Sequence, residues 1–215
     1  MKHLIPTSIA ATCIFAASLA SADTAHRAKI KKLDYEFIDT PRFETIDNPE
    51  RAQERSGVQW LEIEAEVEVE TLHDSRFIPK LIASWHVIVQ EPDFDNQNQG
   101  KAQMVRLTGE FTFLDIRTRD RRTYLVAYIH PDSLARITGD ERPNKQDIVG
   151  VALTLAGPNL TTTGKYARDL EKSTYKPELK WWSNWDRKTY KDLVVAKHRT
   201  PFAPLWTDRH PAVQR

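Results

Sequence analysis

The sequence predicts an all-β protein, an antiparallel β-sandwich with N- and C-terminal extensions. The first observation is the segment 60–70, WLEIEAEVEVE, in which apolar residues alternate with glutamates. Alternation with a period of two places the two kinds of side chain on opposite faces of a strand, whereas a helix would mix them. The second observation is that residues 58–156 hold several strand-like segments separated by turn residues, without a long helical period.

The first elements follow from local pattern. Residues 30–38 alternate loosely and are expected to form an edge strand, followed by a charged, proline-containing connection that ends at residue 57. After the glutamate strand, the segment 80–91 is apolar on both faces, which is typical of a central strand. A polar loop follows at residues 92–100.

The second half of the chain is less regular. Residues 104–116 are expected to form a strand with a bulge or bend near Gly109, and residues 123–130 to pair with it as a hairpin. Residues 148–156 form the next expected strand. Beyond Gly164 the chain is basic, aromatic and punctuated by prolines, so it either completes the sandwich or wraps around it as an arm.

The N-terminal residues have the layout of a secretory signal peptide. Lys2 precedes an apolar run, and Ala20-Ser21-Ala22 forms a cleavage site. The alternative is an uncleaved membrane anchor, but the apolar run is short for a span and is interrupted by Pro6. Cleavage after Ala22 would remove the only cysteine, Cys13, and exclude disulfide and thiol chemistry.

Composition narrows the class of protein. The chain has 215 residues, with 31 Lys and Arg against 30 Asp and Glu, and the leader carries one of the lysines. A neutral mature chain with scattered charges argues against binding to nucleic acid or to anionic membranes. No other segment is long and apolar enough to span a membrane. We expect an exported bacterial cell-envelope protein, located in the periplasm, on the outer-membrane surface or outside the cell.

The expected domain organisation has four parts. Residues 1–22 are the signal peptide, 23–57 an N-terminal strand and connection, and 58–183 the β-sandwich domain. Residues 184–215 form a C-terminal aromatic and basic segment that packs on the sandwich or extends it.

Trp85 refines the fold class. It lies in the middle of a strand on an apolar face, near the position at which an immunoglobulin-like sandwich keeps a core tryptophan. We therefore predict an immunoglobulin-like antiparallel β-sandwich with Trp85 in its core. The apolar face of the segment 60–70 should face Trp85, and the glutamates should lie outside.

The row of glutamates permits three interpretations. Cross-strand pairing with Lys29, Lys31, Lys32 or an arginine is the plain one. Calcium binding needs converging oxygens, whereas carboxylates two residues apart on a strand are about 7 Å apart. Docking of a basic partner is the third interpretation. The polar loop 93–100 is only faintly similar to a calcium loop, because its closing glutamate is missing.

Two clusters are candidate contacts for a ligand or partner. The first comprises Trp181, Trp182 and Trp185. Aromatic side chains of this density either stack on sugars or bind proteins, or they complete the core.

The second cluster is basic and lies at an expected hairpin tip. It comprises Arg119, Arg121 and Arg122. Such residues either bind an anionic ligand or are simply exposed to solvent.

Signals for catalysis are missing from the sequence. It has no HExxH, no G-x-S-x-G and no glycine-rich phosphate loop, and the histidines of the mature chain are scattered. We predict no catalytic residue, no metal and no cofactor. A carboxylate pair for glycoside hydrolysis stays open, because any two acids can meet in the fold.

Taken together, several features resemble the small secreted pilus-like proteins of Akkermansia and related Verrucomicrobia. These features are the export signal, the cysteine-free mature chain, the strands WLEIEAEVEVE and LIASWHVIVQEP, and the aromatic KWWSNWD. The resemblance covers most of the mature chain and implies an immunoglobulin-like sandwich with a non-enzymatic role in pilus-associated assembly or host contact. It carries over no catalytic or ligand residues.

The chain departs from type IV pilins in one respect. Those proteins polymerise through a retained apolar N-terminal helix, and this chain would lose its apolar N-terminal segment at Ala22. Edge-strand pairing or packing of the C-terminal segment would have to replace that helix. We expect protein partners or self-association at the cell surface. The alternatives are a carbohydrate-binding module or adhesin with an aromatic platform, and a hydrolase.

Overall fold

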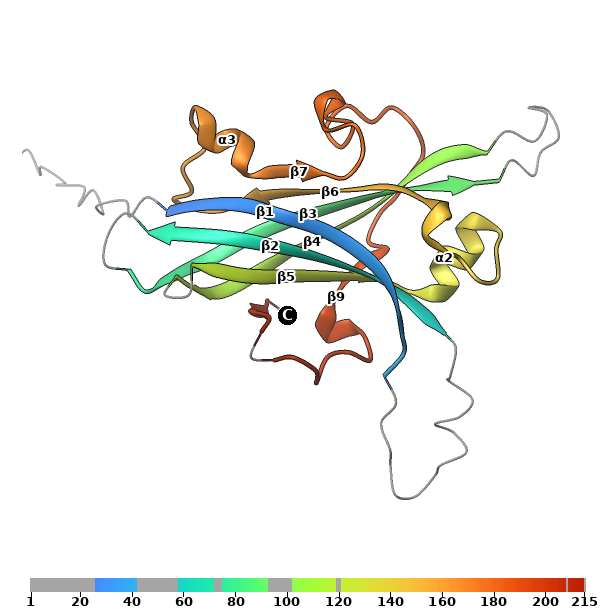
Figure 1. The fold of residues 1–215 in the computed structure, drawn as a ribbon, viewed down its shortest axis with the longest axis horizontal. Helices are drawn as coiled ribbons and strands as arrows, with labels where there is room; N and C mark the ends of the chain where they lie inside the picture. The colour runs from blue at the N-terminus through green and yellow to red at the C-terminus, as the bar shows by residue number, and fades with distance from the viewer. Residues whose placement is uncertain are drawn as a thin grey trace, which may run out of the picture.

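The computed structural model describes residues 26–41, 58–71, 75–92, 102–118, 121–207 and 209–214. It consists mostly of β-strands in two packed sheets (Figure 1), which confirms the predicted all-β sandwich. The expected leader, the connection before residue 57, the polar loop 93–100 and Arg119 lie outside the described residues. None of the described helices is long and apolar enough to span a membrane.

The four-stranded sheet has the order β1-β2-β5-β9. Its members are β1 (His26–Asp39), β2 (Gln59–Thr71), β5 (Arg122–Ile129) and β9 (Val194–Ala196). β1 is the predicted edge strand, and a bulge between Ile30 and Lys32 interrupts its antiparallel pairing with β2. β2 is the glutamate strand, and all its inward-facing apolar side chains from Leu61 to Val69 are fully buried.

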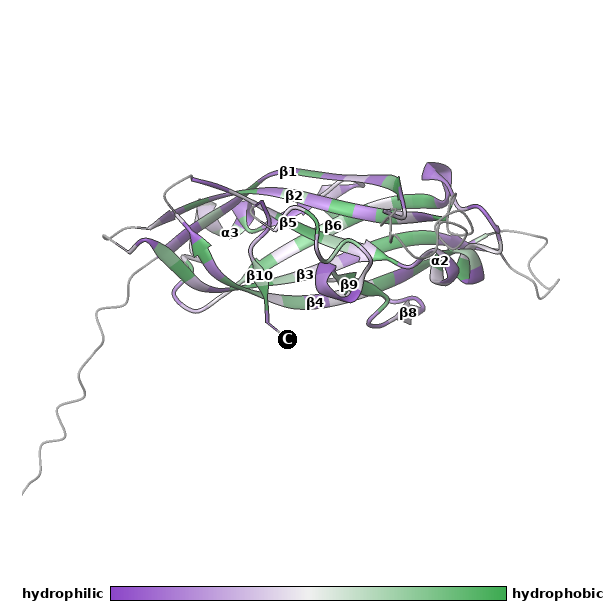
Figure 2. Cartoon of the chain, turned by 90° about the horizontal axis from the view of Figure 1, so that it is seen from below, coloured by the Kyte–Doolittle hydropathy of each residue, from purple (hydrophilic) through white to green (hydrophobic). Residues whose placement is uncertain are grey.

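The second sheet has the order β10-β4-β3-β6-β7, and β8 also pairs with β4. Its members are β3 (Phe77–Glu91), β4 (Gln103–Arg117), β6 (Ile148–Ala156), β7 (Glu171–Ser173), β8 (Thr189–Tyr190) and β10 (Ala212–Val213). Apolar and polar residues alternate along the long strands of both sheets (Figure 2). Trp85 on β3 is fully buried in the same core cluster as the apolar face of β2, as predicted.

The predicted hairpin between residues 104–116 and 123–130 is wrong. β4 pairs with β3 in one sheet and β5 pairs with β2 in the other, so the chain crosses between the sheets after Arg117. The physical reason lies in β5, whose outward-facing Val126 and Tyr128 are buried as well as its inward-facing residues. A strand that is apolar on both faces needs a covered, central position, and β5 has one between β2 and β9.

Gly109 does not mark a bulge, because the β3–β4 ladder keeps one register through this residue. The glycine instead allows a close approach of β9. A Cβ at this position would collide with the carbonyl oxygen of Val194 and lie 2.8 Å from its carbonyl carbon. Only a residue without a side chain lets the backbones of β4 and β9 come this near.

Short helices connect the strands. α2 (Pro131–Thr138) is capped by the ring of His130, which accepts a hydrogen bond from the backbone of Asp132 at 3.2 Å, and it ends at Gly139 in the left-handed conformation. The others are α3 (Lys165–Asp169) and the 3-10 turns η2 (Lys145–Asp147), η3 (Pro177–Leu179) and η4 (Lys197–Arg199).

The C-terminal part of the chain contacts both sheets. Figure 1 shows α3, β7 and the chain that follows on one side of the sandwich, and the segment after β9 on the other. In between, β8 pairs with β4 and β9 with β5, and near the end of the chain β10 returns to β4. This segment therefore adds strands to both sheets and also covers their outer faces.

Candidate functional site

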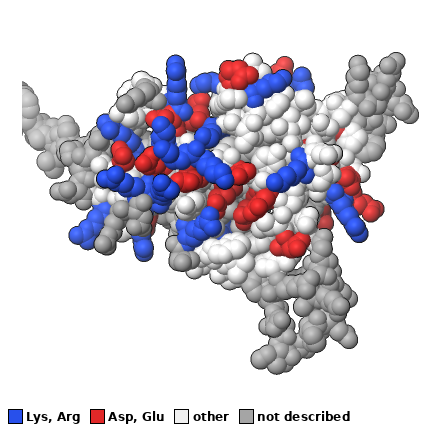
Figure 3. Space-filling view, viewed as in Figure 1, with Lys and Arg blue, Asp and Glu red and all other residues white. Residues whose placement is uncertain are grey.

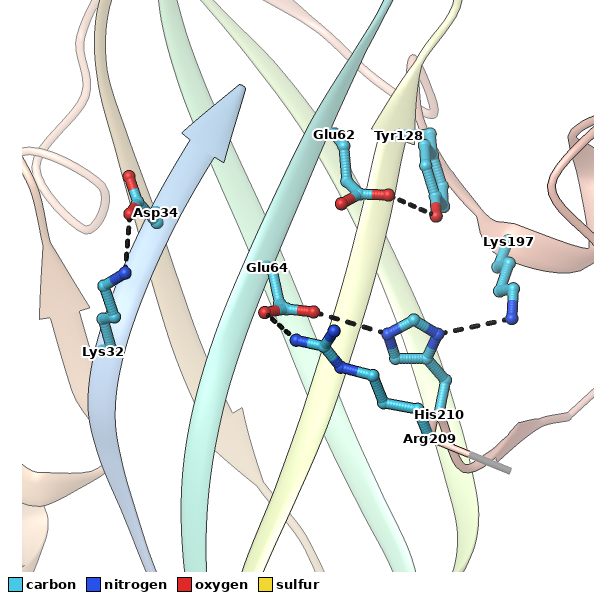
Figure 4. Close-up of polar contacts among 8 residues, drawn as sticks. All are labelled: Lys32, Asp34, Glu62, Glu64, Tyr128, Lys197, Arg209 and His210. Carbon is cyan, nitrogen blue, oxygen red and sulfur yellow. Dashed lines mark hydrogen bonds and ion pairs between the residues drawn. The ribbon is translucent and has the colours of Figure 1, made fainter. Parts of the chain in front are cut away.

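The outer face of the four-stranded sheet holds the glutamates of β2. Figure 4 shows Glu62 bound by a residue of β5 and Glu64 bound by the C-terminal segment. The hydroxyl of Tyr128 donates to a carboxylate oxygen of Glu62 at 2.7 Å. The ring of Tyr128 is stacked on Phe202, with centroids 4.8 Å apart. Burial raises the pKa of Glu62, although the hydrogen bond from Tyr128 opposes this shift. Glu62 is thus a covered hydrogen-bond acceptor.

Glu64 holds the end of the chain to the same sheet. Its carboxylate accepts a hydrogen bond from Arg209 at 2.7 Å and lies 3.5 Å from Nε2 of His210. The other ring nitrogen of His210 is 3.3 Å from Nζ of Lys197, and Lys197 also donates to the carbonyl of Leu205. These contacts link three positions of the C-terminal segment to β2. Glu64 therefore binds basic residues of the C-terminal segment of the same chain.

Glu66 and Glu68 form cross-strand pairs of the predicted kind. Lys31 lies 3.3 Å from Glu68, and Arg122 lies 3.3 Å from Glu66. Figure 3 shows the cationic and anionic side chains interspersed on this face.

Two of the predicted lysine partners pair elsewhere. Lys29 pairs with Asp169 at 3.2 Å, and Lys32 with Asp34 at 2.9 Å. Among the described residues, no three His, Cys, Asp or Glu side chains are grouped so as to hold a metal ion.

The predicted tryptophan cluster lies on the outer face of the other sheet. Trp181 and Trp182 are only 7% and 6% exposed, and they pack with Ile88 of β3 and Ala152 of β6. The indole N–H of Trp181 donates to the carbonyl of Tyr175 at 2.8 Å. This burial favours the packing interpretation of the cluster over a flat sugar-binding platform.

Two partly buried basic groups lie under the tryptophans. The guanidinium of Arg106 donates to the carbonyl of Trp182 at 2.7 Å and lies 5.9 Å from the centre of the Trp185 ring. The ring of His86 meets Trp181 edge-on, with centroids 6.5 Å apart. Burial, together with the charge of Arg106, lowers the pKa of His86 from 6.5 to about 4.

We expect the protein to lose stability as the pH falls from 6.5 towards 4. In this window the unfolded chain binds a proton at His86 and the folded chain does not, so protonation favours unfolding. The contribution is fully present above pH 6.5, and its loss reaches about 3 kcal/mol near pH 4. Urea denaturation at pH 7 and pH 4.5 measures the effect. His86→Gln should lose less stability between pH 7 and pH 4.5 than the wild type does; equal losses in the variant and the wild type would contradict the assignment.

Arg121 and Arg122 are the members of the predicted basic cluster that lie among the described residues. Arg121 has a positive φ of 54°, and its carbonyl accepts a hydrogen bond from the backbone of Val69 at 3.0 Å. Arg122 extends from the start of β5 to Glu66. Both arginine side chains are exposed, at the end of the sandwich where the chain crosses between the sheets.

A groove of about 730 Å³ opens between β4 and β9. The apolar part of its lining comes from Phe111, Val194, Ala196 and Val213. The groove could not be predicted from the sequence, since its walls come from strands that are far apart in the chain. The one signal for it is Gly109, which marks where β9 approaches β4.

Trp206 was also missed as a candidate contact. It is 47% exposed, and its ring meets that of His210 edge-on, with centroids 6.3 Å apart. It lies in the segment that covers the four-stranded sheet, on the opposite side of the sandwich from the buried tryptophans.

Comparisons with known proteins agree with the architecture. None of the curated proteins matches the sequence. A crystal structure of a protein from Akkermansia muciniphila is similar, with a TM-score of 0.71 and 22% sequence identity, over 90% of this chain and 96% of that chain. At this identity the likeness concerns the fold alone. A family model matches residues 19–215, almost the whole sequence, and the chain therefore belongs to the family that this model defines.

Proposed function

We propose that the protein is a non-enzymatic, exported cell-surface protein that acts through protein contacts, in pilus-associated or other surface assembly or in host contact. The observation that carries the proposal is which surfaces of the sandwich the chain itself covers and which it leaves exposed. The chain covers parts of both outer faces of the sandwich with its own C-terminal segment, while the groove between β4 and β9 stays open along a strand edge. Open strand edges are surfaces that bind other chains.

The proposal includes an immunoglobulin-like topology. In support, β1-β2-β5 corresponds to strands A-B-E of that fold, and β4-β3-β6-β7 corresponds to C′-C-F-G. β9 then takes the place of strand D beside strand E.

Three measurements on the producing bacterium test the proposal. Mass spectrometry of the envelope fraction should give a mature chain that begins at Asp23, and a membrane-impermeant amine reagent should label Lys180, whose side chain is 55% exposed. Chemical cross-linking of intact cells should give a discrete protein adduct. A cytoplasmic protein with its leader attached, or an uncross-linked monomer, would refute the proposal.

A second candidate function is glycan binding, as a carbohydrate-binding module or adhesin. The observation in its favour is the exposed Trp206. A glycan array decides between the candidates. A hit that disappears in Trp206→Ala would favour the adhesin, and silence across the array would count against it.

A further inference from the structure

We infer that the groove between β4 and β9 is a strand-addition site, which binds an extended segment of another protein. The inference rests on the proposed function, because it names the surface and the kind of partner through which the protein would act.

The backbone of β4 has an unpaired stretch on the side of the groove. β8 pairs with Arg106 and Leu107, and β10 pairs with Phe113 and Leu114. Between these two short strands, no strand in the described part of the chain pairs with β4 on this side. The open stretch extends from residue 108 to residue 111, because the carbonyl of Thr112 already accepts from Gln214.

The direction of the backbone groups follows from the bonds at both ends of this stretch. The N–H of Arg106 donates outward to the carbonyl of Lys188 at 3.0 Å, and the carbonyl of Thr112 accepts from the N–H of Gln214 at 2.8 Å. In a strand, the N–H and C=O of one residue point to the same edge, and the edge alternates along the chain. The N–H and C=O groups of Thr108 and Glu110 therefore also point to the groove side, where an added strand would meet them.

The other long edge of the sandwich, β1, is built to resist pairing. It carries a bulge after Ile30, and charged side chains alternate along its second half at Lys32, Asp34 and Glu36. Bulges and edge charges are devices that prevent a further strand from adding. The open stretch of β4 has a single charged residue, Glu110, and keeps one register. A new strand would therefore add to β4 in preference to β1.

The lining of the groove indicates the chemistry of the segment that fits. Phe111, Val194, Ala196 and Val213 supply apolar contacts for alternate side chains of an extended peptide. Glu110 and Asp192 lie at the end of the groove where Val194 of β9 approaches Gly109 of β4. Arg199, which follows β9 in the chain, lies at the other end of the groove. A matching segment has small apolar residues at alternate positions, a cation at the acidic end and an anion at the basic end.

The charges also set the direction of the segment. A peptide with lysine at its N-terminal end and glutamate at its C-terminal end would run parallel to β4. β8 already adds to the same edge in the parallel direction. The proposed partner is therefore an extended segment of the type Lys-Val-Thr-Val-Thr-Glu, whose four central residues add parallel to residues 108–111 of β4.

A capped peptide of this sequence tests the inference on the mature protein. Titration followed by amide NMR and hydrogen exchange should protect the N–H groups of Thr108 and Glu110. The same peptide with N-methyl groups on the amides that face β4 should bind about tenfold more weakly, because it cannot donate to the strand edge. The reversed-charge peptide, with glutamate first and lysine last, should also bind more weakly.

A charge-swap variant provides the control on the protein side. Arg199→Glu should weaken binding of the peptide that ends in glutamate and strengthen binding of the peptide that ends in lysine. Unchanged exchange at Thr108 and Glu110 under saturating peptide, or protection of β1 instead, would overturn the inference. Protection that grows with protein concentration without any peptide would also overturn it, since the occupant would be a second copy. A cell-surface adduct combined with failure of these tests would leave the proposed function standing and remove only this site.

Discussion

Gly109→Val is expected to destabilise the protein by roughly 3 kcal/mol, because the new side chain would collide with the backbone of β9. The obstacle is the carbonyl group of Val194, and a backbone group cannot rotate away as the end of a long side chain can. The collision would push β9 off β4 and strain its pairing with Tyr128 and Ile129. Urea denaturation measures the loss as a lower midpoint.

The control for this variant is Thr108→Val, on the neighbouring residue of the same strand. The side chain of Thr108 points to the outer face, so this change places a valine on the same strand without meeting β9. The free energy of unfolding of this variant should lie within about 0.5 kcal/mol of the wild-type value. Similar losses in the two variants would show that β4 is simply intolerant of valine and would contradict the close approach at Gly109.

Trp181→Ala should cost about 4 kcal/mol, as expected for removal of a buried tryptophan. The change would open a cavity over Ile88 and Ala152 and leave the carbonyl of Tyr175 without the indole N–H that it accepts. The loop that carries the tryptophans would lose its main attachment to the six-stranded sheet. Thermal and urea denaturation measure the loss.

Trp206→Ala provides the matched control. Trp206 is 47% exposed, so its removal should cost less than about 1 kcal/mol. A small loss in Trp181→Ala, comparable with that of Trp206→Ala, would mean that the tryptophan cluster does not hold the loop. That result would favour the interpretation of Trp181 and Trp182 as a sugar-binding platform.

The parts of the fold that the sequence predicts are those with a period of two. The glutamate strand could be assigned to β2, with its two faces correctly sorted, because apolar and charged residues alternate there without exception. Trp85 could be placed in the core for the same reason. Alternation within one strand does not say which strand lies beside it, so the pairing of β5 with β2 could not be predicted.

The covering of the outer faces was harder to foresee, since it depends on contacts between distant segments. One signal was present in β6, where the outward-facing positions Gly150 and Ala152 are small. Gly150 lies directly under the side chain of Tyr175, and Ala152 lies in the cluster with the tryptophans. Small residues on the outer face of a central strand thus indicated that large side chains pack on it.

The contacts of the C-terminal segment also bear on how the protein folds. β9 and β10 belong to different sheets, and both pair with strands made much earlier in synthesis. Closing such long loops is entropically costly, and non-local pairings of this kind fold slowly. Until the last part of the chain has been synthesised, apolar residues such as Ile88 and Tyr128 have no cover. The nascent chain is therefore most prone to aggregate just before its synthesis ends.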